Sequence, residues 1–114
     1  MITAAAEKDG VLVLVLEGNL EISKQSKLKD ELQKQIALSS NMQILVDLRK
    51  VSFVDSACLG VFIGLARQVR KDGGDIRLAG LNDEVMAIFQ MTRLDKVFQI
   101  FAANEQGISS YQSS

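Results

Sequence analysis

The stretch VSFVDSACLGVFIG, residues 51–64, decides the fold of this chain. Its first residues are typical of a buried strand, and an Asp-Ser pair then interrupts the apolar run. The residues after this pair repeat apolar side chains at helical spacing, as Leu59 and Ile63 show. A buried strand that passes directly into a helix is the unit from which parallel α/β sheets are built. We therefore expect Ser56 to lie where a strand ends and a helix begins.

Apolar runs on both sides of this stretch predict the other strands of the sheet. VLVLVL at residues 11–16 is apolar on both faces, which indicates a central strand covered on both sides, and residues 17–19 (EGN) end it. Residues 3–7 and the turn at residues 8–10 (KDG) precede it as the first arm of a hairpin. The remaining strands are expected at residues 44–48, 76–79 and 97–101.

Four helices are expected between and after these strands. Ser23 is a candidate N-cap for the first, whose apolar side chains repeat every four residues from Leu28 to Ile36. The second begins at the Asp-Ser pair and ends in RKDGG, because cations favour the last turn of a helix and glycine favours its C-terminal position. The third covers residues 83–92, and Asn104 caps the last.

This alternation predicts a single α/β domain over residues 1–114 with right-handed crossovers. The sheet is expected to be mainly parallel, with the N-terminal strand antiparallel at its edge and about four helices packed against it. The serine-rich tail, residues 109–114, is expected to fray and to be mobile. In open sheets of this kind, binding sites lie where the carboxyl ends of strands meet the amino ends of helices.

Composition excludes several classes of function. With 47% hydrophobic and 24% charged residues, the 114-residue chain can bury a core. Its net charge of -1 gives no general attraction to nucleic acid, so no nucleic-acid partner is expected. No apolar run has membrane-spanning length, and the first residues do not resemble a signal peptide. The single cysteine fits a reducing compartment, so we expect a cytoplasmic protein without direct membrane insertion.

The chain contains no histidine and only one cysteine. Nucleophilic catalysis by Ser-His-Asp or Cys-His groups is therefore excluded, as are zinc sites that need imidazole or a cluster of cysteines. There is also no glycine-rich phosphate loop of either common pattern. We expect a protein without catalytic activity, bound metal or cofactor.

Ser56 has two interpretations that the residues alone leave open. As the N-cap of the helix, its hydroxyl would accept a backbone hydrogen bond and stabilise the fold by about 1 kcal/mol. As a phosphoacceptor, it would place a phosphate at a helix N-terminus, where unpaired N–H groups and the helix dipole favour negative charge. The same position at the start of the helix suits Ser56 for either role.

Three acidic residues are expected at the same edge of the sheet: Glu21, Asp47 and Asp55. Clustered carboxylates can bind Mg²⁺, but acids at strand ends more often serve as turn or cap residues. Cys58 falls in the first helical turn, where the pKa of a thiol can drop, although the apolar residues after it favour ordinary burial.

Gly60 and Gly64 lie on one helical face. This face either packs closely against the sheet or, if it is exposed, receives a partner. The sequence leaves both possibilities open.

Several segments in order resemble one known family. FVDSACLGVFIG at residues 53–64 resembles the DSSGLG signature of the anti-sigma factor antagonists, members of the STAS family that is shared with sulphate transporters. GNLEI at residues 18–22 resembles the family's GELD-type segment, and ILVDLRKVSFVDS at residues 44–56 resembles its third strand and the approach to the serine. Residues 71–98 follow the later helix-strand-helix course. The resemblance covers nearly the whole chain.

The resemblance implies a non-enzymatic switch. In bacterial antagonists of this kind, the serine that matches Ser56 is phosphorylated by an anti-sigma factor that is itself a serine kinase. The unphosphorylated antagonist sequesters that kinase, phosphorylation breaks the complex, and a PP2C-type phosphatase restores it. The residues implied in partner binding are Glu21, Asp55, Ser56, Ala57, Cys58 and Gly60.

The chain departs from the family pattern at two places. Ala57-Cys58 stands where the family usually has Ser-Gly, and Glu21 matches an aspartate. A cysteine in place of glycine enlarges the start of the helix, which bears on how the kinase approaches Ser56.

Two other functions stay open. A second hypothesis is a STAS accessory subunit of a membrane transport system, for lipids or anions, which would bind the ATPase of that system. It could also be a phosphoaspartate receiver that uses Asp47, although the acidic pair that a receiver has after its first core strand is missing.

Overall fold

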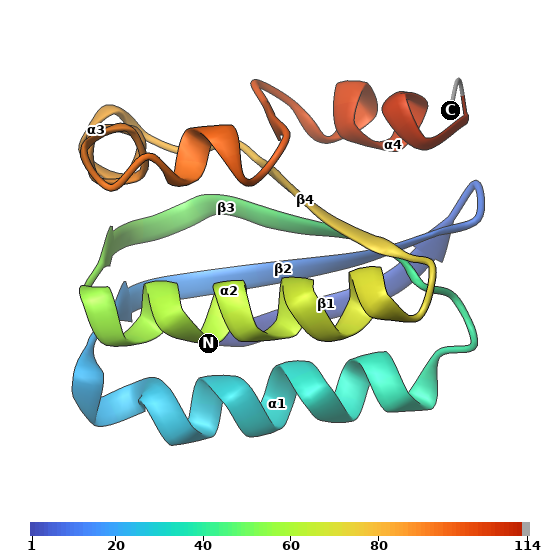
Figure 1. Cartoon of the computed structure of the whole chain (residues 1–114), viewed down its shortest axis with the longest axis horizontal. Helices are drawn as coiled ribbons and strands as arrows, with labels where there is room; N and C mark the ends of the chain where they lie inside the picture. The colour runs from blue at the N-terminus through green and yellow to red at the C-terminus, as the bar shows by residue number, and fades with distance from the viewer. Residues whose placement is uncertain (113–114) are drawn as a thin grey trace.

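Five strands form one sheet in the order β1-β2-β3-β4-β5 in a computed structural model that describes residues 1–112 (Figure 1). Their bounds are β1 Ile2–Lys8, β2 Val11–Leu20, β3 Gln43–Val54, β4 Asp75–Ala79 and β5 Ile100–Phe101. β1 pairs antiparallel with β2, and the other three pairs of neighbours are parallel. The predicted sheet, mainly parallel with an antiparallel N-terminal strand at its edge, is confirmed.

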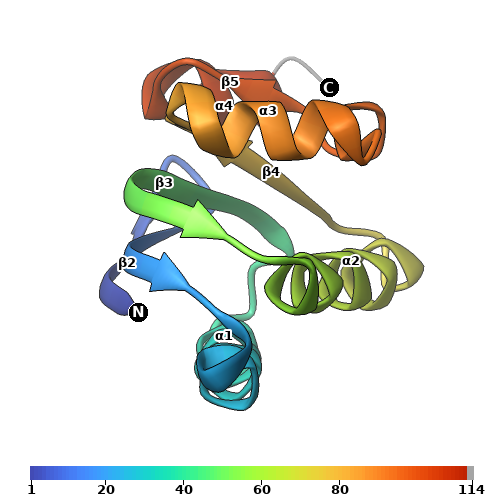
Figure 2. The same cartoon turned by 90° about the vertical axis from the view of Figure 1, so that its left-hand side faces the viewer.

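The helices cover both faces of this sheet. They are α1 Gln25–Leu38, α2 Ser56–Lys71, α3 Asp83–Met91 and α4 Asn104–Gln112, with short 3-10 turns η1 Ile22–Lys24 and η2 Leu94–Lys96. α1 and α2 lie together on one side of β2 and β3, and α4 lies on the other (Figures 1 and 2). Successive side chains of β2 point to opposite faces, so Leu14 joins the core under α1 and α2 whereas Val11 packs with Ile108 and Tyr111 of α4.

β2 and β3 both run further than the sequence predicts. β2 continues through Glu17 to Leu20, and β3 continues through Arg49 to Val54. The predicted ends at residues 17–19 and at residue 48 are wrong, because charged side chains on a strand can point to solvent while the backbone pairing goes on. Glu17 pairs with Lys50 in this added part of the ladder. The extension carries the two strands to a common end.

The starts of α1 and β5 also differ from the prediction. Ser23 does not cap α1, because it lies within the 3-10 turn η1 and Lys24 occupies the N-cap position without a side-chain hydrogen bond. The last strand is only Ile100–Phe101, since the residues before it form the turn η2.

The C-terminal segment is ordered further than expected. Residues 109–112 belong to α4, and Tyr111 is buried with its hydroxyl 3.2 Å from the Ile44 N–H and 2.6 Å from the Ile44 carbonyl. The prediction of a frayed tail is wrong for these residues, because Tyr111 anchors them to β3. Residues 113–114 of that tail lie outside the described part of the chain.

Candidate functional site

The carboxyl ends of β2 and β3 lie side by side and define the candidate site. Leu20 and Val54, the last residues of the two strands, pair with each other. The backbone N–H of Asp55 then donates to the carbonyl of Leu20 at 2.9 Å, and α2 begins at Ser56. The prediction that Ser56 starts a helix at the carboxyl edge of a parallel sheet is confirmed.

Asp55, rather than Ser56, caps α2. The backbone of Asp55 is extended (φ -90°, ψ 175°), and its Oδ1 accepts a hydrogen bond from the Cys58 N–H at 3.0 Å. The interpretation of Ser56 as the N-cap is wrong, because the carboxylate one residue earlier already satisfies that donor. Ser56 is the first helical residue and is exposed. Its side chain therefore lies on the surface, at the positive end of the helix dipole.

Two side chains fasten the start of α1 and the segment before it to the first turn of α2. Cys58 Sγ donates to the Glu21 carbonyl at 3.3 Å, and Gln25 Nε2 donates to the Ala57 carbonyl at 3.3 Å. Cys58 is fully buried, so its side chain offers no surface to a partner in this structure, and its thiol joins the segment before α1 to the first turn of α2. Burial, together with the charge of Asp55, raises the pKa of the Cys58 thiol to about 11, so the thiol stays protonated at neutral pH.

Asp47 lies away from this edge. It sits in the middle of β3, opposite Ala79 of β4, and is fully buried. Its Oδ2 accepts from Arg49 Nη2 and from Asn104 Nδ2, both at 2.8 Å. Burial alone would raise the pKa of Asp47, but the hydrogen bonds from Arg49 and Asn104 outweigh it and the pKa is lowered. The expectation that Asp47 shares an edge with Ser56 is wrong, because β3 does not end until Val54.

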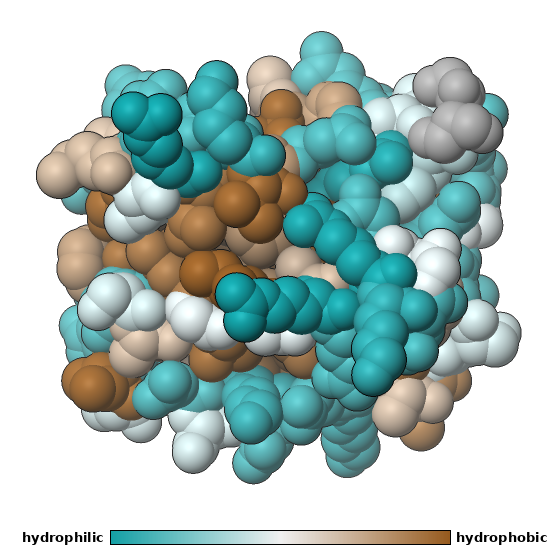
Figure 3. Space-filling view, viewed as in Figure 1, coloured by the Kyte–Doolittle hydropathy of each residue, from teal (hydrophilic) through white to brown (hydrophobic). Residues whose placement is uncertain are grey.

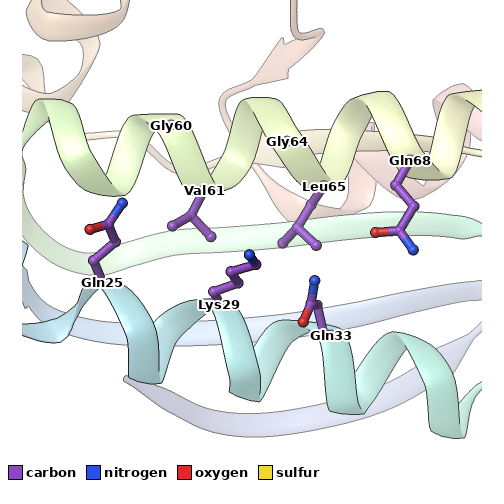
Figure 4. A pocket seen from close by; sticks show the side chains of 8 residues that line it. All are labelled: Gln25, Lys29, Gln33, Gly60, Val61, Gly64, Leu65 and Gln68. Carbon is purple, nitrogen blue, oxygen red and sulfur yellow. The ribbon is translucent and has the colours of Figure 1, made fainter.

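Gly60 and Gly64 leave the outer face of α2 open. Both are exposed, and nothing lies within 4 Å of the place that a Cβ would occupy. They border a groove of about 280 Å³ between α1 and α2 (Figure 4). The other residues that line it are Gln25, Lys29 and Gln33 of α1 and Val61, Leu65 and Gln68 of α2. Of the two possibilities that the sequence leaves open for this face, the structure shows the exposed one.

Comparison with known proteins identifies the family. Residues 3–107 match the STAS domain as a protein family. This chain belongs to the STAS domain family. The resemblance of its segments to that family is therefore confirmed.

Relatives of this STAS domain carry informative names. The anti-sigma-B factor antagonist of Bacillus subtilis (strain 168) is 29% identical to it over 93 residues, which cover 82% of this chain and 84% of the relative. The crystal structure of TM1081 from Thermotoga maritima has a TM-score of 0.87 at 21% identity, covering 94% of this chain and 92% of that one. The structure of the anti-sigma factor antagonist SpoIIAA in its unphosphorylated form has a TM-score of 0.79 at 20% identity, over 97% and 96% of the two chains. The two structures establish the fold.

Sequence reasoning missed two exposed apolar side chains of the STAS domain close to Ser56. Ile22 is 69% exposed and directly follows Glu21, and Phe53 is 40% exposed and lies two residues before Asp55. Phe53 sits within a strand-like apolar run, so its sequence gives no sign that it faces solvent. Ile22 stands alone between polar residues, and that isolation was the available signal.

Sequence reasoning also missed a polar face of α1. The four-residue spacing of Gln25, Lys29 and Gln33 is a signal that these side chains share one face of a helix. In the structure this face forms one wall of the groove beside Gly60 and Gly64 (Figure 4).

The opposite flank of α2 has a different character. Figure 3 shows hydrophobic residues gathered in a hollow between α2 and α3, with hydrophilic residues over most of the surrounding surface. Ile63 of α2 and Ile88 of α3 are apolar residues that are only partly buried. α2 of this STAS domain therefore has a glutamine-lined groove on one side and an apolar hollow on the other.

Other kinds of site find little support in the STAS domain. Among residues 1–112, no group of three or more histidine, cysteine, aspartate or glutamate side chains could hold a metal ion. Within the same residues, no helix is long and apolar enough to cross a membrane. The buried and fully engaged carboxylate of Asp47 also argues against a phosphoaspartate receiver, which needs an accessible acceptor.

Proposed function

We propose that this STAS domain is a non-enzymatic switch, an anti-sigma factor antagonist whose state is set by phosphorylation of Ser56. The observation that carries the proposal is the division of roles at the start of α2. Asp55 caps the helix, which leaves the exposed Ser56 side chain without a structural task. The names of the relatives support the same function, since the Bacillus subtilis protein is an anti-sigma-B factor antagonist.

The unphosphorylated domain binds an anti-sigma factor that is also a serine kinase. The surface around Ser56 suits such a partner, because the exposed apolar side chains of Ile22 and Phe53 lie on the segments that meet there. Interfaces gain most of their affinity from a few residues that become fully buried in the complex. Glu21, Asp55, Ala57 and Gly60 complete the contact surface, and the groove beside Gly60 continues it along α2.

Phosphorylation of Ser56 breaks this complex. A phosphate adds about -1.5 to -2 charge at neutral pH. In the complex it would be desolvated beside the carboxylate of Asp55, and an unpaired charge in an interface costs several kcal/mol. Since each 1.4 kcal/mol is about tenfold in affinity, we expect a loss of about two to three orders of magnitude.

The isolated domain keeps its fold in both states. The N-terminus of α2 stabilises a nearby negative charge by typically 0.3–1 kcal/mol, which offsets part of the repulsion from Asp55. A PP2C-type phosphatase then removes the phosphate and restores binding. The whole cycle takes place in the cytoplasm.

The test is a binding titration with a kinase encoded beside the gene for this chain. Ser56→Ala should bind that kinase as the wild type does and should not be released when ATP is added. Ser56→Asp should fold but bind weakly. Ser40→Ala, at an exposed serine before β3, is the matched control and should behave as the wild type in binding and release. Phosphate found by mass spectrometry on another residue, or equal affinities of Ser56→Asp and Ser56→Ala, would refute the proposal.

A further inference from the structure

The two edges of the sheet differ in length and exposure. β5 at one edge has two residues, whereas β1 at the other has seven, Ile2–Lys8. Within residues 1–112, no backbone hydrogen bond joins β1 to any strand other than β2. Residues 3–8 are all exposed. The outer N–H and C=O groups of β1 therefore face solvent along most of its length.

β1 lacks most of the features that normally protect an open edge. Natural edge strands carry proline, charges or bulges that prevent pairing with another chain. The chain contains no proline, and the one irregularity of β1, between Ile2 and Ala4, affects only its start. The register is regular over residues 4–8, and charges occur only at the last two positions, Glu7 and Lys8.

Exposed apolar surface continues from this edge onto α1. Leu38, the last residue of α1, is 73% exposed. A hollow of about 200 Å³ lies beside it, lined by the apolar residues Ala5, Ala6 and Leu12 and by the polar residues Glu7, Gln35 and Ser39. On the other face of the sheet, Val13 and Val15 of β2 are only partly buried. An edge strand flanked in this way by apolar side chains is suited to pair with a further strand.

We propose that β1 pairs antiparallel with β1 of a second copy of this chain, around a two-fold axis at Ala6. The regular part of the strand, residues 4–8, is centred on Ala6. Pairing about that point places Ala4 opposite Lys8, Ala5 opposite Glu7, and Ala6 opposite Ala6. No two like charges stand directly opposite each other, so this register permits a symmetric dimer.

The dimer also covers the exposed apolar surface. A two-fold axis normal to the sheet keeps both copies of α1 on the same face, so the hollows beside Leu38 are brought together at the axis. The alanine side chains are small on both faces, and a second strand can approach without a clash. The carboxyl edges of the two sheets then point in opposite directions, which leaves both Ser56 surfaces free.

Sedimentation equilibrium over increasing protein concentration tests the dimer. We expect the mass of the wild type to rise from one chain to two. Ala6→Lys places two like charges opposite each other at the axis and should raise the dissociation constant about tenfold or more. Ala102→Lys adds the same charge at an exposed position in the loop after β5 and should dimerise as the wild type does. Circular dichroism checks that both variants are folded.

Cross-linking tests the register. Directly opposite residues of antiparallel strands have Cα atoms about 4.5–5.5 Å apart, which a disulfide can span. Ala6→Cys should therefore form a covalent dimer on mild oxidation much faster than Ala102→Cys. The buried Cys58 of the wild type should not react. A wild type that stays monomeric at all concentrations, or a dimer that Ala6→Lys does not weaken, would overturn the proposal, as would an edge occupied by the strand of another protein.

Discussion

At the start of α2, two neighbouring residues divide two tasks between them. The Asp55 carboxylate accepts a hydrogen bond from the Cys58 N–H, one of the backbone donors in the first turn that have no partner within the helix. Ser56, in contrast, faces solvent. Aspartate and serine are about equally good N-caps, so the sequence alone could not say which of the two caps the helix. The choice is settled by the extended backbone at Asp55, which follows from its hydrogen bond to Leu20.

We predict that Asp55→Ala lowers the free energy of unfolding by about 1 kcal/mol, because the helix loses its cap. Asp55→Asn should retain most of that stability, since an amide oxygen can accept the same bond. Ser56→Ala should change the free energy of unfolding by less than about 0.5 kcal/mol, as expected for an exposed residue. Urea denaturation measures all three. A larger loss for Ser56→Ala than for Asp55→Ala would show that the cap is assigned to the wrong residue.

Asp47 makes the stability of the folded chain depend on pH in the acid range. Its pKa in the folded chain is lowered from the ordinary value of 3.8. As the pH falls below 3.8, the unfolded chain therefore binds more protons at this position than the folded chain does. The stabilisation by Asp47 is fully present above pH 3.8 and is lost as the pH falls through the pKa of the folded state. We predict that the wild type loses stability more steeply below about pH 4 than Asp47→Asn does, with Asp72→Asn, at an exposed position, as the control. Equal slopes for the wild type and Asp47→Asn, from urea denaturation at each pH, would contradict the prediction.

Among the elements, α2 has one face that packs in the core and an outer face that carries two exposed glycines. Seven of its side chains, Cys58 and Val69 among them, are buried, but Gly60 and Gly64 stand exposed in the interior of the helix. Glycine in a helix interior is less favourable than alanine because it loses more backbone freedom on folding. The two glycines therefore keep this face of α2 open, and they lower the stability of the helix.

We predict that Gly64→Ala raises the free energy of unfolding by about 0.5–1 kcal/mol, since open space surrounds its Cβ position. Gly107→Ala in α4 is the matched contrast. It gains the same helix propensity, but its Cβ would lie 2.6 Å from Leu45 Cδ1, so it should destabilise. Thermal unfolding of the two variants measures the difference. A destabilising Gly64→Ala would show that this face is packed rather than open.

The elements also show how far the sequence predicts the structure. The strand at VLVLVL and the helix after Ser56 follow directly from the spacing of apolar residues. The ends of the strands do not follow, because charged residues such as Arg49 can stay in a strand when its neighbour continues alongside. The edge that holds Ser56 was therefore predictable, but the place of Asp47 in mid-strand was not.

At the scale of the whole molecule, α4 anchors the C-terminal part of the described chain to strands β3 and β4 of the sheet. Tyr111 lies against both β3 and β4, since its hydroxyl is 2.6 Å from the Ile44 carbonyl and 2.9 Å from the Asp75 carbonyl. The guanidinium of Arg77 stacks on its ring, with 3.9 Å from Cζ to the ring centroid. Burial, aided by the charge of Asp75, raises the pKa of the Tyr111 phenol above its ordinary value.

We predict that Tyr111 ionises only when the fold opens. It is the one tyrosine of the chain, which has no tryptophan, so absorbance of the phenolate reports on it alone. Because its folded pKa is raised, stability is fully present below the ordinary value of 10.0 and is lost as the pH rises through the folded pKa. Absorbance should therefore stay flat past that pH and rise together with the loss of circular dichroism. Ionisation of a still-folded chain at the ordinary pKa would contradict the buried position of α4.

Both ends of α2 are fastened to the rest of the molecule. Asp55 holds its start to β2, and in its last turn Arg70 donates to Asp75 from Nε and to the Val97 carbonyl from Nη2, both at 2.7 Å. A helix held in this way has no loose end from which to fray, so its amides exchange hydrogen with solvent only through larger openings. A phosphate on Ser56 should then leave exchange rates beyond the first turn of α2 unchanged. A partner would detect a change in the charge of this surface while its shape stays the same.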